Sequence, residues 1–140
     1  MNISRERRFS GHRRAVGPLG LWDEDDQWHS PASRAFAEMS RRREPLFTTS
    51  YIIAECANAT ARWIARERIA TLVNSLHAAG GFIFPTDHDW NLAWSRYTSG
   101  SPGGPGLVDH LSFAVLQRLG LKRAFTNDRH FAAFEFEPLF

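Results

Sequence analysis

The sequence predicts an α/β domain in which a central, mostly parallel sheet is flanked by helices. Short apolar runs of strand length alternate with longer segments in which apolar residues recur at helical spacing. A helix between two strands returns the chain to the starting edge of the sheet, so this alternation favours parallel strands. With 140 residues, 43% of them hydrophobic, the chain has the size and composition of one globular domain.

Two helices are predicted in the first part of the chain. Ser30 and Pro31 are typical of a helix start, as N-cap and first helical residue, and helical spacing continues to the arginine run 41–43. Thr49 or Ser50 can cap the second helix. We expect the inner face of this second helix to consist of Ile52, Ile53, Cys56, Ala59 and Trp63.

Two further helices are predicted in the middle of the chain. One runs from about Arg66 to the glycine pair 80–81, and the next begins at a capping box formed by Thr86 and Asp89. The loop 99–106 is rich in glycine, serine and proline but lacks the spacing of a phosphate-binding glycine fingerprint. A nucleotide-binding protein is therefore disfavoured.

The last long helix is predicted from about Leu107 to Leu119 and is expected to stop at Gly120. Leu111, Val115 and Leu119 should face inward. The predicted strands are residues 45–48, 82–84, 123–126 and an edge strand at 134–137.

Charge is distributed unevenly along the chain. Residues 1–14 contain five arginines and one glutamate, whereas the remainder holds 12 basic and 14 acidic residues. We expect residues 1–14 to form a basic, flexible arm, either simply solvated or bound to RNA phosphates, and residues 15–140 to form the domain. The single cysteine excludes an internal disulfide, and no apolar run reaches the roughly 20 residues of a membrane span. A cytoplasmic protein is expected.

Three carboxylates stand in apolar surroundings: Glu55 on the second helix, Asp109 in the first turn of the last long helix, and Asp128 after the third strand. Burying a carboxylate is costly unless it is paired, hydrogen-bonded or bound to a cation. Ligands of parallel sheets bind beyond the carboxyl ends of the strands, where oxygen ligands would suit Mg²⁺ or Mn²⁺. We therefore predict that the three carboxylates converge on one cation site.

Each carboxylate also has a purely structural interpretation. Asp109 could interact with the positive end of its helix. Asp128 could be a turn or cap residue, and Glu55 could pair with Arg62 or another arginine.

Three segments resemble the acidic motifs of PIN-domain ribonucleases, in particular the VapC-type toxins of toxin–antitoxin pairs. Residues 48–59 resemble the second acidic motif of that family, residues 107–115 the third, and residues 124–131 its threonine-x-aspartate motif. They occur in the family's order, and the resemblance covers residues 15–140.

The resemblance implies a PIN-like fold and a metal-dependent endoribonuclease that hydrolyses RNA phosphodiester bonds. Glu55, Asp109 and Asp128 would be the catalytic ligands of Mg²⁺ or Mn²⁺, supported by Thr126 and Arg129. The resemblance also implies an RNA substrate and an antitoxin protein as partner, and it is compatible with a homodimer.

The N-terminal motif departs from the family pattern. Ala15 stands where the family has its first aspartate, and the preceding residues 9–14 are too polar for a buried central strand. The N-terminal strand is therefore expected to be atypical or missing. Two hypotheses follow: a ribonuclease with a weakened site, or a catalytically impaired PIN-fold protein that acts by binding RNA or a partner.

The chain is unusually aromatic, with 11 phenylalanines and five tryptophans. Trp22, Trp28, Trp90 and Trp94 are expected to fill the core. The alternative is an exposed groove in which a partner docks.

Overall fold

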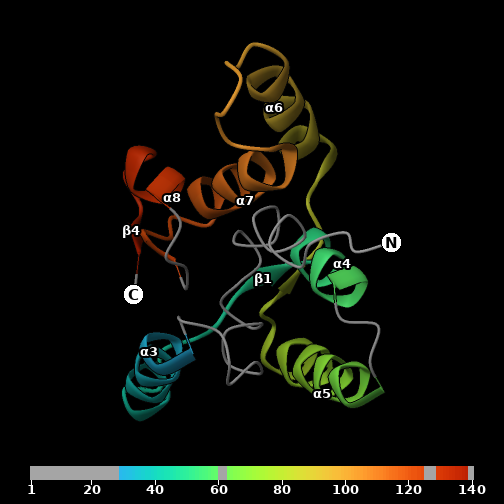
Figure 1. Ribbon diagram of the computed structural model, residues 1–140, viewed down its shortest axis with the longest axis vertical. Helices are drawn as coiled ribbons and strands as arrows, with labels where there is room; N and C mark the ends of the chain where they lie inside the picture. Colours follow the sequence, from blue (N-terminus) through green and yellow to red (C-terminus); the bar gives the residue numbers. More distant parts are fainter. Residues whose placement is uncertain (1–28, 60–62, 125–128, 139–140) are drawn as a thin grey trace, which may run out of the picture.

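One or two helices separate successive strands in the computed structural model, which describes residues 29–59, 63–124 and 129–138 (Figure 1). The helices are α3 (His29–Arg41), α4 (Ser50–Ala59), α5 (Trp63–Ala79), α6 (Asp87–Thr98), α7 (Leu107–Arg118) and α8 (Arg129–Ala133). The strands are β1 (Thr48–Thr49), β2 (Phe82–Ile83), β3 (Arg123–Ala124) and β4 (Glu137–Pro138). The expected α/β class with parallel strands is confirmed.

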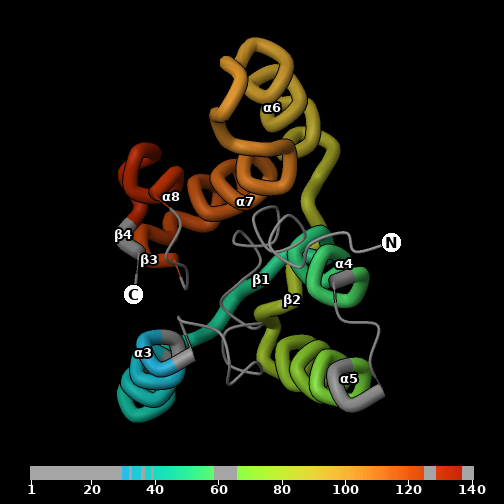
Figure 2. Tube along the Cα trace, viewed as in Figure 1, coloured from blue at the N-terminus to red at the C-terminus, as the bar shows by residue number. Residues whose placement is uncertain are grey.

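The described strands form two short parallel pairs. β1 lies beside β2 at the centre of the molecule, with Thr48 opposite Phe82, and β3 pairs with β4 (Figure 2). At the entrance to the first pair, a Cβ added to Gly81 would lie 2.0 Å from the carbonyl oxygen of Leu46. Only glycine permits this approach of the two backbones.

Three strand predictions were wrong in their bounds, and the one at 82–84 only because β2 ends at Ile83. The strand expected at 45–48 begins only at Thr48, in keeping with Pro45, which has no N–H to donate to a ladder. The edge strand expected at 134–137 is reduced to Glu137–Pro138, because the chain turns at Phe134 and Glu135, where Glu135 adopts a left-handed φ of 64°.

Helix signals in the sequence were more accurate. The Thr49 hydroxyl accepts a hydrogen bond from the Ile52 amide at 3.3 Å, and the capping box of Thr86 and Asp89 is formed at the start of α6. α3 starts at His29, one residue before the expected cap. Trp63 belongs to α5, which starts three residues earlier than expected, and not to the inner face of α4.

Two helices end as their glycines predicted. Gly80 and Gly120 have φ values of 73° and 68°. The amide of the residue after each glycine donates to a carbonyl in the last helical turn, Gly81 to Leu76 at 2.8 Å and Leu121 to Leu116 at 2.9 Å. These are the bonds of a Schellman motif.

The central helix of the molecule is α7, in which every residue from Asp109 to Val115 is buried. Phe113 is fully buried and stacks on Phe134 and Phe136, with ring centroids 4.3 and 5.6 Å apart. Leu119, expected inside, is instead exposed, because it lies beyond the last helical residue.

A second cluster joins α4 to α5. Its buried members are Cys56 and Ile69, and Ile52, Ile53 and Val73 pack against them. The expected inner face of α4 is therefore confirmed for Ile52, Ile53 and Cys56. None of the helices within the described ranges is long and apolar enough to cross a membrane.

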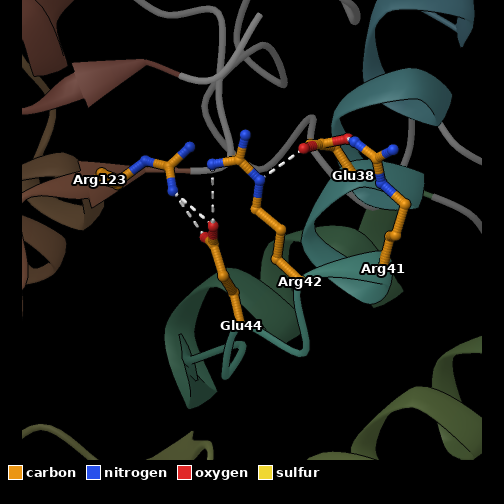
Figure 3. Close-up of polar contacts among 5 residues, drawn as sticks. All are labelled: Glu38, Arg41, Arg42, Glu44 and Arg123. Atoms are coloured by element: carbon orange, nitrogen blue, oxygen red, sulfur yellow. Dashed lines mark hydrogen bonds and ion pairs between the residues drawn. The ribbon is translucent and has the colours of Figure 1, made fainter.

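Ion pairs connect the end of α3 to the β3–β4 pair (Figure 3). Glu38 of α3 pairs with Arg41, the last residue of that helix, and with Arg42, which follows it. Beyond the helix, the Glu44 carboxylate accepts hydrogen bonds from Nη1 of Arg123, the first residue of β3, at 2.7 Å. Residues 79 positions apart are thereby joined at the molecular surface.

Candidate functional site

A cleft opens beyond the carboxyl ends of β1 and β2. Its volume is about 380 Å³, and the described residues that line it are Ser50, Tyr51, Ala54, Phe84 and Pro85. Ser50 follows β1 directly and Phe84 follows β2 directly. The cleft therefore lies at the edge of the parallel strands where the sequence predicted a site.

Glu55 is half-buried on α4, next to Ala54 of the cleft and one helical turn after Tyr51. Residues four apart on a helix share a face, so Glu55 and Tyr51 lie on the same side of α4. The cap at Thr49 anchors this helix to the end of β1, which fixes where the Glu55 backbone stands relative to the strand.

Cys56, beside Glu55, is fully buried. Burial, and then the negative charge of Glu55, raises the pKa of its thiol to about 12. The thiol therefore stays protonated at neutral pH and cannot act as a nucleophile. Its predicted role as a core residue is confirmed.

Asp109 is 1% exposed in the first turn of α7. Its Oδ2 accepts a hydrogen bond from the amide of Gly106, the N-cap residue, at 3.1 Å. The structural interpretation of Asp109 as a helix-start residue is thus borne out. It does not exclude a ligand role, because an ionised carboxylate has about four acceptor positions.

His110, next to Asp109, is a buried polar residue that the sequence analysis did not single out. Its ring meets those of Phe113 and Phe134 edge-on, at centroid distances of 5.8 and 5.6 Å. Burial lowers its pKa, and the positive charges of Arg96 and His130 lower it further. The imidazole is therefore neutral at pH 7, and among the described residues its Nδ1 has no hydrogen-bond partner.

The remaining predicted site residues are only partly covered. Asp128, Thr126 and Ala15 lie outside the described residues, and Arg129 is the exposed first residue of α8. The described ranges contain no group of three or more histidine, cysteine or acidic residues placed to hold a metal. The convergence of Glu55, Asp109 and Asp128 therefore stays a prediction. The chemistry of the two described carboxylates, one half-buried and one fully buried, fits a hard divalent cation.

The expectation that the tryptophans fill the core is wrong for the two on α6. Trp90 and Trp94 are 36% and 48% exposed, while Trp22 and Trp28 lie outside the described residues. Tyr51 and Phe84, which line the cleft, were also not recognised as site residues. A signal was available, since Phe84 ends one short run of strand length and Tyr51 lies three residues beyond another.

No protein-family model matches the chain, and no curated protein sequence does. Among solved structures, the chain is similar to VapC20 of Mycobacterium tuberculosis, a toxin described as cleaving the sarcin–ricin loop. The TM-score is 0.64 at 21% sequence identity, and the match covers 89% of this chain and 91% of the other. The expected PIN-like, VapC-like fold is thereby confirmed.

Proposed function

We propose that this protein is a Mg²⁺- or Mn²⁺-dependent endoribonuclease, the toxin of a toxin–antitoxin pair. The observation that carries the proposal is a fully buried carboxylate, Asp109, at the start of the central helix of a VapC-like fold. An ionised carboxylate has about four acceptor positions, so Asp109 can accept from the Gly106 amide and also bind a hard divalent cation. The solved neighbour, described as a toxin that cleaves the sarcin–ricin loop, supports the same class of activity.

In this proposal Glu55, Asp109 and Asp128 hold the cation. When bound, the cation supplies an activated water and neutralises charge that develops on the phosphate. The Gly106 amide fixes the Asp109 carboxylate in place before substrate arrives. The neutral imidazole of His110 adds no positive charge that would repel the cation.

No side chain of the site needs to attack the phosphate. The Cys56 thiol is buried and protonated, so it stays outside the chemistry. Thr126 would orient a carboxylate by hydrogen bonding, and exposed Arg129 would contact a substrate phosphate. We further propose an antitoxin protein that inhibits the enzyme in the cytoplasm. Sedimentation analysis would test whether the protein also forms a homodimer.

The test is cleavage of RNA by the full chain with Mn²⁺ and with EDTA. We expect Mn²⁺-dependent cleavage that Glu55→Gln abolishes. Glu67→Gln is the matched control, because Glu67 is an exposed glutamate on the neighbouring helix α5. Cleavage that persists in EDTA, or that survives in Glu55→Gln, would contradict the proposal.

The second candidate is a catalytically impaired PIN-fold protein that acts by binding RNA or a partner. Ala15, in the place of the family's first aspartate, favours it. The same experiment separates the two functions: RNA binding without cleavage at saturating Mn²⁺ identifies the impaired protein.

A further inference from the structure

We draw no further inference here: the strongest candidate, the exposed aromatic surface that Tyr51 of α4 forms with Trp90, Trp94 and Tyr97 of α6, is an apolar face for which nothing in the structure shows what covers it.

Discussion

The carboxylate of Asp109 serves the helix and, in the proposed function, the cation as well. Its hydrogen bond to the Gly106 amide stabilises the start of α7 and requires only an oxygen atom, whereas the cation requires the negative charge as well. A substitution that keeps a side-chain oxygen at position 109 but removes the negative charge can therefore separate the two roles.

Asp109→Asn should retain a side-chain oxygen for the Gly106 amide, and we expect a loss of about 1 kcal/mol or less in the free energy of unfolding. Cleavage should fall by more than about 100-fold, because even indirect support of a metal ligand is worth that much. Urea unfolding and a Mn²⁺-dependent cleavage assay check both parts. A variant as active as the parent at saturating Mn²⁺ would exclude Asp109 as a ligand.

Ala15 offers a gain-of-function test. Cation affinity depends on the number of carboxylates, so Ala15→Asp should bind Mn²⁺ more tightly than the parent and cleave at lower Mn²⁺ concentration. Calorimetric titration of both proteins is the measurement. Equal affinities would mean that a ligand comes from elsewhere or that residue 15 does not reach the site.

At the scale of elements, α6 and α7 are held together by an ion pair between their opposite ends. The Arg118 Nε and Nη2 atoms donate to the Asp89 carboxylate at 2.9 to 3.1 Å, and the Thr86 amide donates to the same group at 2.9 Å. Burial by itself raises the pKa of Asp89, but the bonds from Arg118 and Thr86 outweigh it and leave that pKa below its ordinary value.

A lowered pKa in the folded state makes this contribution to stability dependent on pH. The contribution is complete above the unfolded-state pKa of about 3.9 and is lost as the pH falls through the lower folded-state value. We expect Asp89→Asn to cost about 2 kcal/mol at pH 7, a difference that shrinks below about pH 4. Unfolding curves at several pH values test this. Asp87→Asn, an exposed aspartate of the same helix turn, should change little.

The pair of Glu44 and Arg123, visible in Figure 3, should behave differently. Both side chains are partly exposed, at 27% and 40%, so water and salt screen their attraction. A double-mutant cycle with Glu44→Gln and Arg123→Gln should give a coupling energy of about 0.2–1 kcal/mol that decreases with added salt. A larger, salt-independent coupling would show that the pair anchors β3 more firmly than its exposure suggests.

At the scale of the whole molecule, the proposed cation joins segments that are far apart in the sequence. A ligand that binds only the folded protein stabilises it, by about 2.7 kcal/mol at 100 times its Kd. For a domain of this size we expect Mn²⁺ to raise the Tm of the parent by roughly 5–10 °C. Glu55→Gln and Asp128→Asn should each abolish this rise.

The Tm without metal provides the control, because removing one of several mutually repelling carboxylates should leave it equal or higher. If only one of the two variants loses the Mn²⁺ effect, the carboxylates do not share a site.

Local signals account for what the sequence analysis predicted correctly. The capping box at Thr86 and the left-handed Gly80 and Gly120 depend on backbone groups within a few residues, so the sequence alone determines where these helices begin and end. Strand bounds were less accurate, since a ladder depends on the distant partner: β1 extends only as far as β2 pairs with it. The three acidic motifs led to the VapC-like fold, which the solved neighbour confirms.

The tertiary structure alone decided which faces are covered. No local pattern predicts that Trp90 and Trp94 remain at the surface beside Tyr51 while Leu111 is fully buried. Burial is determined by the elements that pack around a residue, and these come from other parts of the chain. The sequence by itself identified the candidate carboxylates through their apolar neighbours. The cleft, and the contact of Tyr51 with Trp90, exist only because β1, β2, α4 and α6 meet in the folded molecule.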